Sequence, residues 1–376
     1  MNNISENGTN IFLEQVLDSV KIGVVAFDSD HYISMVNAGL LTFESRTSCD
    51  PRFPSARTNL LYYRHCSSEG YLMKGKDFLS ITDLEPDEVA LMIQRARHIK
   101  ETETPRPLEG KVLALIFEKP SLRTRVSFEV GIRQMGGECI YLSNADIGLG
   151  TREPEIDVAR VLDRLVDGIV ARVFSHGSLE ILAENTTIPV INALSDLAHP
   201  CQSLGDLLTI NESKGNLEGL NVTYVGDGNN IASSLALACS SVGANFTISA
   251  PGDYHVPSIA WDEARRRAAQ KESLLDWVEK PQDAVKGADV VYTDVWISMG
   301  DEAEADERRR VFAEYQVNTE LMSLAKSDAV FMHDMPAHRG EEVSDEMFDH
   351  PKSIVFHQAE NRLHAQKAVM AELFSR

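Results

Sequence analysis

A serine and two arginines lie within five residues, directly after an apolar run that is typical of a buried strand. The apolar run covers residues 112–117, and Ser121, Arg123 and Arg125 follow it. Ser121 is suited to cap the helix that the apolar spacing of residues 126–135 predicts. A helix N-terminus favours an anion, and guanidinium groups match phosphate oxygens. The pattern therefore indicates a phosphate site, although a capped helix with solvated arginines would have the same sequence.

Two further segments place reactive side chains where a strand ends. Arg172 closes the apolar run of residues 168–173, and His199 and Gln202 follow the run of residues 189–194. The carboxyl ends of strands are where open parallel sheets bind ligands. His199 and Gln202 are three residues apart and so lie on one helical face. The alternatives are a surface arginine and a buried histidine with a structural hydrogen bond.

A glycine-rich turn and an acidic segment follow strands later in the chain. The turn, residues 225–230, lacks two features of a dinucleotide site, because Ile231 stands where a third glycine is needed and the next strand ends without an acid. In the acidic segment, Asp294, Ser298 and Met299 supply a carboxylate, a hydroxyl and a thioether together. These residues predict a polar ligand and no nucleotide cofactor.

Five motifs resemble the aspartate and ornithine carbamoyltransferase family, in the family's order, along about residues 74–376. They read F-E-K-P-S-L-R-T-R, H-P-C-Q-S-L-G-D, D-V-W-I-S-M-G, H-D-M-P-A-H-R-G and E-N-R. The first is similar to the family's S-T-R-T-R loop, with Leu122 in place of the usual threonine. The third is similar to the signature of the ornithine-specific members. Residues 294–300 contain no basic side chain, which a second substrate carboxylate would need.

The resemblance implies transfer of the carbamoyl group of carbamoyl phosphate to the δ-amine of L-ornithine. It implies carbamoyl-phosphate contacts at Ser121, Leu122, Arg123, Thr124, Arg172, His199, Gln202, Asp334, Met335 and Arg362. It implies ornithine contacts at Asn230, Asp294, Ser298 and Met299. Arg172, His199, Asp334 and Arg362 are the expected catalytic residues, the histidine and arginines stabilising the oxyanion. We expect no metal and no organic cofactor, because phosphate is already a good leaving group.

Two positions depart from the family pattern. Asp334 occupies the place of a usual cysteine, and Gly148 lies where many members carry a Gln or His that reaches a neighbouring subunit. A carboxylate at residue 334 could bind the substrate ammonium, accept its proton as a general base, or turn away and leave only its backbone near the substrate. The sequence leaves these three interpretations open.

The spacing of strands and helices predicts two doubly wound α/β domains with parallel sheets. Strands are expected at 112–117, 139–143, 168–173, 189–194, 221–225, 245–250, 288–294 and 329–334. We expect a carbamoyl-phosphate domain at 74–212, an ornithine domain at 213–350, and a helix at 359–374 that packs back on the first domain. A further helix is expected over residues 84–100, with Asp83 as its cap.

Residues 1–73 differ from the rest and predict a poorly ordered extension. A short helix at 11–20 and a hairpin of residues 23–27 and 32–36 are expected, followed by a Ser-, Arg- and Pro-rich linker at 44–70. The hairpin region faintly resembles the beginning of a PAS sensor domain, but the segment is too short for a complete one.

Composition restricts the partners of the chain. The formal net charge of −21 argues against nucleic acid and anionic membranes. No apolar run reaches membrane-spanning length, and no signal or transit peptide is recognisable. The five cysteines lack zinc or C-x-x-C spacing and fit reduced thiols in the cytoplasm. The resemblance implies a homo-oligomer, commonly a trimer.

Two other functions remain open from the sequence. A carbamoyltransferase could act on another amine such as putrescine, but Asn230, Ser298 and Met299 would then have no carboxylate to bind. A non-catalytic relative could sense ligands through the N-terminal segment. The intact arginine and His-Pro-Cys-Gln motifs argue against that second alternative.

Overall fold

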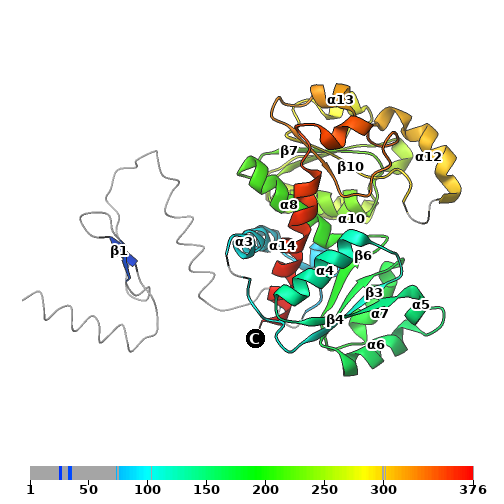
Figure 1. Ribbon diagram of the computed structural model, residues 1–376. Helices are drawn as coiled ribbons and strands as arrows, with labels where there is room; N and C mark the ends of the chain where they lie inside the picture. The colour runs from blue at the N-terminus through cyan, green and yellow to red at the C-terminus, as the bar shows by residue number, and fades with distance from the viewer. Residues whose placement is uncertain are drawn as a thin grey trace, which may run out of the picture. The chain divides into compact units, whose positions relative to one another are not determined.

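The computed structural model describes residues 25–27, 33–35, 73, 76–102, 104–298, 300 and 302–375. Strands β1 (Val25–Phe27) and β2 (Ile33–Met35) pair antiparallel, with Ala26 opposite Ser34, which confirms the predicted hairpin. The predicted helix at 11–20, the linker at 44–70 and Met299 lie outside the described residues. The chain separates into two units, Met1–Glu69 and Gly70–Arg376, and the rest of this section concerns the second (Figure 1).

Two parallel sheets organise the second unit, and they confirm the predicted fold class. The first sheet has the order β4-β3-β5-β6, and the second has the order β11-β10-β7-β8-β9. The strands of the first are β3 (Val112–Phe117), β4 (Glu138–Ser143), β5 (Gly168–Arg172) and β6 (Val190–Leu194). Those of the second are β7 (Asn221–Val225), β8 (Asn245–Ser249), β9 (Leu275–Trp277), β10 (Val290–Thr293) and β11 (Val330–His333).

Helices alternate with the strands, as parallel crossovers require. The first half contains α3 (Pro86–Glu101), α4 (Leu122–Gln134), α5 (Asn144–Ile147), α6 (Glu155–Leu165), α7 (His176–Glu184) and α8 (Pro200–Lys214). The second contains α9 (Asn230–Ser241), α10 (Ser258–Gln270), α11 (Pro281–Ala284), α12 (Ala305–Phe312), α13 (Thr319–Ser323) and α14 (Val355–Phe374). Among the described residues, none of these helices is long and apolar enough to span a bilayer.

The core forms on both faces of each sheet because successive strand residues point to opposite sides. Leu113 and Leu115 of β3 join a cluster that continues to Tyr224 of β7, whereas Ala114 and Ile116 join a separate cluster on the other face. A third cluster, around Phe331, covers the far side of the second sheet. The shared cluster therefore connects the two sheets through the helices between them.

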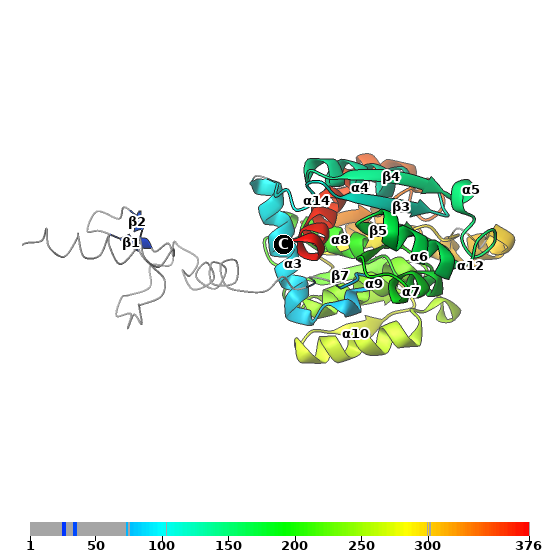
Figure 2. The ribbon, with the colours of Figure 1, turned by 90° about the horizontal axis from the view of Figure 1, so that it is seen from below.

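Helix α14 is a main element of that connection (Figures 1 and 2). It packs against α3, α4 and α8 and also reaches β11. Gly131 of α4 gives it room, because a Cβ there would meet the Met370 side chain at 3.2 Å. Arg95 of α3 forms an ion pair with Glu372. Residues near the end of the chain are thereby held against the first sheet's helices.

Two local predictions were wrong. Asp83 does not cap α3; its carboxylate accepts hydrogen bonds from the backbone N–H groups of Leu79 and Ser80, at 2.6 and 2.8 Å, and closes a short 3₁₀ helix. Glu85 and Glu88 cap α3 instead. Strand β9 was missed because three residues at a sheet edge leave too short a pattern for the alternation to show.

We predict that His364 of α14 makes the protein less stable in mild acid. Burial and the charges of Lys367 and Lys100 lower the pKa of His364 to about 4. Between pH 6.5 and 4 the unfolded chain therefore binds a proton that the folded chain does not, and stability falls as pH falls. The loss at pH 5 is about 1 kcal/mol, less than the full value for a dry site because the ring keeps some solvent contact.

The measurement is thermal unfolding of the wild type and His364→Gln at pH 7.5 and 5. The wild type is expected to lose about 2–4 °C more than the variant on acidification. Equal losses in both proteins would contradict the role of His364.

Candidate functional site

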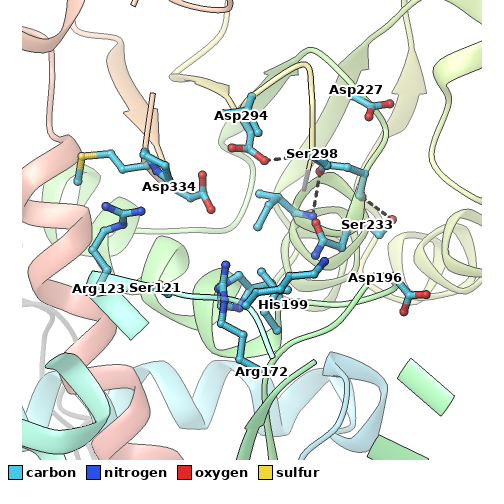
Figure 3. A pocket seen from close by; sticks show the side chains of 18 of the residues that line it. Ser121, Arg123, Arg172, Asp196, His199, Asp227, Ser233, Asp294, Ser298 and Asp334 are labelled. Atoms are coloured by element: carbon cyan, nitrogen blue, oxygen red, sulfur yellow. Dashed lines mark hydrogen bonds between the residues drawn. The ribbon is translucent and has the colours of Figure 1, made fainter. Parts of the chain in front are cut away.

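The site lies where the strand order of each sheet reverses. In the first sheet, β3 has β4 on one side and β5 on the other; in the second, β7 lies between β8 and β10. The loops that leave the carboxyl ends of these neighbouring strands diverge and open a crevice. A cavity of about 650 Å³ occurs there, lined from both sheets by residues that include Ser121, Arg172, Asn230 and Asp294 (Figure 3).

The loop after β3 begins α4 and carries the predicted phosphate ligands. Ser121 is the N-cap, confirming that prediction, and its hydroxyl accepts the Thr124 N–H at 3.3 Å. The Thr124 hydroxyl is buried and accepts hydrogen bonds from Arg362 at 2.8 Å and Arg172 at 3.4 Å. Thr124 therefore positions two guanidinium groups from beneath the cavity, and its side chain does not line the cavity.

The two arginines of this loop point to different places. Arg123 lines the cavity, and its buried Nε has no hydrogen-bond partner. Arg125 instead donates to Glu129 at 2.7 Å and lies over the Tyr141 ring at 3.7 Å from the centroid. Leu122 also lines the cavity, although its side chain is 74% exposed. Of the two arginines, only Arg123 is placed to bind an anion in the cavity.

Arg172, His199 and Arg362 form a buried cationic group around the same end of the cavity. They come from the end of β5, the N-cap of α8 and the middle of α14. Burial, with Arg362 nearby, lowers the pKa of Arg172 to about 10, so Arg172 remains charged at neutral pH. Burial and three arginines lower the pKa of His199 well below its usual value. His199 is thus a neutral imidazole beside positive charges, suited to donate a hydrogen bond.

Gln202 lies one turn into α8 and is held from below. Its Nε2 donates to Asp206 at 2.9 Å, and its buried Oε1 has no partner. Asp206 also accepts from Gln358 at 2.7 Å and from the Tyr292 hydroxyl at 3.2 Å. The amide is therefore oriented with its carbonyl oxygen unoccupied, although Gln202 does not line the cavity in this conformation.

Two carboxylates form the opposite end of the cavity. Asp294 follows β10 and Asp334 follows β11, and parallel pairing aligns Thr293 with His333 immediately before them. Asp294 accepts a hydrogen bond from Asn229 Nδ2 at 2.9 Å. Burial and the Asp334 carboxylate raise the pKa of Asp294 well above its usual value. Figure 3 shows both carboxylates entering the pocket from above, opposite Arg172 and His199.

His333 completes this corner but is not available to a metal ion. Its Nδ1 accepts the Met335 N–H at 2.8 Å, and its Nε2 faces Glu342 Oε1 at 3.1 Å. Both ring nitrogens are thus engaged, and the lone pair that a metal would need already holds the backbone. Met335, which lines the cavity, is held in a left-handed conformation with φ of 59°.

The remaining predicted residues lie at the second sheet's side of the cavity. Asn230 and Ser298 both line it, and the Asn230 carboxamide donates to the Ser195 carbonyl at 2.6 Å. Met299 lies outside the described residues. The cavity is therefore lined by polar side chains from the second sheet, by the acidic pair Asp294 and Asp334, and by the cationic group.

Comparison with known proteins agrees with this geometry. Residues 76–212 match the family model "Aspartate/ornithine carbamoyltransferase, carbamoyl-P binding domain", and residues 218–373 match "Aspartate/ornithine carbamoyltransferase, Asp/Orn binding domain". The chain belongs to the aspartate/ornithine carbamoyltransferase family. Ornithine carbamoyltransferase of Thermococcus kodakarensis is 52% identical over 303 residues, which cover 80% of this chain and 96% of that protein.

Solved structures of the family have the same fold. The ornithine carbamoyltransferase of Pyrococcus furiosus has a TM-score of 0.78 and 48% identity, covering 80% of this chain and 97% of its own. That of Gloeobacter violaceus has a TM-score of 0.74 and 42% identity, covering 81% and 100%. An N-acetyl-L-ornithine transcarbamylase variant has a TM-score of 0.73 and 31% identity, covering 79% and 99%.

Several residues that line or support the cavity were not predicted from the sequence. Lys119 lines the cavity and was visible only as part of F-E-K-P. Asn229 caps α9 and holds Asp294, and its position before a predicted helix was a usable signal. Arg308 donates to Asp227 at 2.8 Å and to the Trp296 carbonyl at 3.0 Å, and so holds the loop after β10. That contact joins segments 81 residues apart, so no local pattern predicts it.

Proposed function

We propose that the protein transfers the carbamoyl group of carbamoyl phosphate to the δ-amine of L-ornithine, giving L-citrulline and phosphate. The observation that carries this proposal is the opposed charge of the two cavity ends. Arg123, Arg172 and Arg362 suit a phosphate, and the adjacent carboxyl groups of Asp294 and Asp334 suit an alkyl ammonium group. The relatives named ornithine carbamoyltransferase support the same assignment.

In the proposed mechanism the residues bind, orient and stabilise charge. Ser121, Leu122 and Arg123 hold the phosphate, Thr124 orients Arg172 and Arg362 toward it, and Met335 supplies backbone beside the carbamoyl group. His199 donates to the carbamoyl oxygen while Arg172 and Arg362 stabilise its developing charge. Gln202, after a change of rotamer, accepts from the carbamoyl nitrogen. Orientation of the two substrates contributes about 7–11 kcal/mol.

The α-amino-acid end of ornithine is assigned to the second sheet's side of the cavity. Asn230, Ser298 and Met299 bind its carboxylate and amino group, and Asp294 attracts the δ-amine. Carbamoyl phosphate binds first, and closure of the two domains, 74–212 and 213–350, then excludes water. Aspartate is disfavoured because its second carboxylate would face Asp294.

A citrulline assay with ornithine, N-acetylornithine, putrescine and aspartate offered separately tests this assignment. Ornithine is expected to exceed each of the other three by at least about a hundredfold in kcat/KM, a difference of roughly 2.7 kcal/mol. Preference for putrescine would assign the cavity to a diamine, and preference for N-acetylornithine would assign it to an acylated substrate. Absence of turnover with all four would favour the ligand-sensing alternative.

We further propose a cytoplasmic homotrimer that acts in arginine biosynthesis. A relative named "Ornithine carbamoyltransferase, anabolic", from Pyrococcus furiosus, supports the direction. Free Cys139, Cys201 and Cys239 suit a reducing compartment. Leu122 is largely exposed, and Val126 and Ile140 are about half exposed. Exposed apolar side chains of this kind are suited to an interface with a second copy of the chain. Light scattering should give about 125 kDa, three times the chain mass of 41.7 kDa.

The N-terminal segment is expected to be dispensable for turnover. Both family domains and every described cavity residue lie between residues 76 and 373. A chain that begins at Tyr71 should therefore fold and convert ornithine at a rate within about twofold of the full chain. Circular dichroism and the citrulline assay measure the two properties. An insoluble or folded but inactive product would assign the segment to the fold or the site.

A further inference from the structure

Asp334 lines the cavity, and one oxygen of its carboxyl group lacks a hydrogen-bond partner in the protein. Its Oδ1 is buried and has no hydrogen-bond partner, at 3.7 Å from His333 Nδ1, whose lone pair is already used by the Met335 N–H. Figure 3 shows the carboxylate directed to the middle of the pocket, between Arg123 and Asp294. Asp334 therefore does not turn away from the site, as one of the three interpretations required.

The charges around Asp334 favour its ionised form over that of its neighbour. Asp294 and Asp334 share a hydrogen bond, and burial with the adjacent carboxylate makes Asp294 the protonated partner. Burial raises the pKa of Asp334 above its usual value, while the hydrogen bond with Asp294 and the facing Arg362 of α14 and Arg123 of α4 oppose that rise; Asp206 of α8 adds to it. The remaining neighbours are His333, Arg172, Tyr224 and Tyr292. The pKa of Asp294 is thus raised further than that of Asp334, and a proton held by the pair is favoured on Asp294.

We propose that Asp334 is the base that removes a proton from the δ-ammonium group of the amino substrate inside the cavity. The inference rests on the proposed function. A primary alkyl ammonium has a pKa of about 10.4, so at pH 7 about one molecule in 2,500 is the free amine. The carbonyl oxygen of Asp294 and the Asp334 carboxylate can accept hydrogen bonds from the ammonium, and the Asp334 carboxylate can take its proton.

Proton removal and carbamoyl transfer balance in atoms and charge. One N–H proton moves from the ammonium to the Asp334 carboxylate and leaves a neutral amine. The amine lone pair forms the N–C bond to the carbamoyl carbon, and the electrons of the C–O bond leave with phosphate. The second N–H proton departs with the phosphate as HPO₄²⁻, and Asp334 later returns its proton to solvent. No oxidant, reductant or further reactant is needed.

A cysteine, the usual family residue here, would not perform this step at neutral pH. Burial raises the pKa of the Cys201 thiol of α8 to about 12, and a buried thiol at residue 334 would be raised for the same reason. With a cysteine at residue 334, turnover would depend on ornithine that binds as the free amine. With Asp334 in this position, the ammonium form of ornithine can bind and react, because the carboxylate removes its proton inside the cavity.

The pH dependence of kcat/KM for ornithine in the wild type, Asp334→Asn and Asp334→Cys tests the proposal. Both variants should be about ten- to a hundredfold less active at pH 7, because they depend on free amine from solution. Their activity should rise about tenfold per pH unit, and the deficit should shrink to less than about threefold at pH 10. The wild-type profile should level off at a lower pH. Asp334→Cys restores the usual family residue, so it guards against a folding defect.

Three controls make the outcomes distinct. Asp349→Asn, the same change at an exposed side chain that does not line the cavity, should reproduce the wild-type profile. Inhibition by 2-aminopentanoate, which lacks the δ-amine, should stay within about twofold in both variants. Parallel pH profiles in all three proteins, or a loss of inhibition above tenfold in both variants, would overturn the role of Asp334. No turnover of ornithine by the wild type would instead overturn the proposed function itself.

Discussion

Arg123→Ala is expected to lower kcat/KM for carbamoyl phosphate by at least about a hundredfold. Arg123 lines the cavity, and its Nε is buried without a partner, so two donors of its guanidinium group can reach a phosphate. A charge-assisted hydrogen bond contributes about 1.5–3 kcal/mol, and each 1.4 kcal/mol is a factor of ten. Two such bonds account for a hundredfold loss or more. Steady-state kinetics with carbamoyl phosphate as the varied substrate measures it.

Arg125→Ala is the matched control. It removes the same side chain from the same helix, but Arg125 pairs with Glu129 and lies outside the cavity. An exposed ion pair of this kind contributes less than about 1 kcal/mol, so the variant should saturate normally with carbamoyl phosphate. Equal losses in the two variants would mean that helix α4 was disturbed, and normal kinetics of Arg123→Ala would remove this loop from the phosphate site.

His199→Ala is expected to lower kcat by about 10²–10³ with a much smaller change in KM. Loss of one hydrogen-bond donor to a developing oxyanion has this effect in other enzymes. His199 is buried, its Nδ1 has no partner, and its backbone N–H is fixed to Ser234 Oγ at 2.8 Å. The backbone of His199 is thus fixed, while the Nδ1 atom of its imidazole ring has no hydrogen-bond partner in the protein. Single-turnover measurements at saturating substrates isolate the chemical step.

His199→Gln distinguishes donation from acid–base chemistry. Burial and the facing arginines keep the pKa of His199 low, so the ring stays neutral and acts through its N–H. A glutamine amide retains an N–H donor, and we expect it to recover about tenfold over alanine. The acidic limb of the wild-type pH profile should persist in His199→Gln. Disappearance of that limb would show that His199 titrates during turnover and would contradict a neutral donor.

Much of the fold follows from local pattern. Apolar runs of five or six residues buried on both faces, such as residues 112–117, are typical of central parallel strands, and all eight predicted strands occur. Edge elements were less predictable, because β9 has only three residues and its faces are partly exposed. The cap of α3 was misplaced because Asp83 is a preferred cap residue, but its carboxylate closes the preceding 3₁₀ helix and α3 begins after Glu85.

The residue types of the site were also visible in the sequence, but their relations were not. Arg123 and Arg125 cannot be told apart by residue type. Their positions on helix α4 place Arg123 in the cavity and Arg125 beside Glu129. Thr124 resembled a phosphate ligand, whereas tertiary packing makes its hydroxyl the acceptor for Arg172 and Arg362. Those three residues lie on separate elements, so their meeting depends on the docking of α14.

The sequence by itself determined which chemical groups the protein possesses, because motif residues within one loop are kept together by the chain. The succession of strands and helices along the chain, which indicates two α/β domains, also follows from the sequence. Only the tertiary structure decided the partners of those groups. Parallel pairing of β10 with β11 brings Asp294 beside Asp334, forty residues later in the chain, and burial of both makes their charges interdependent. Proximity across such separations depends on packing of the whole core, which no local pattern contains.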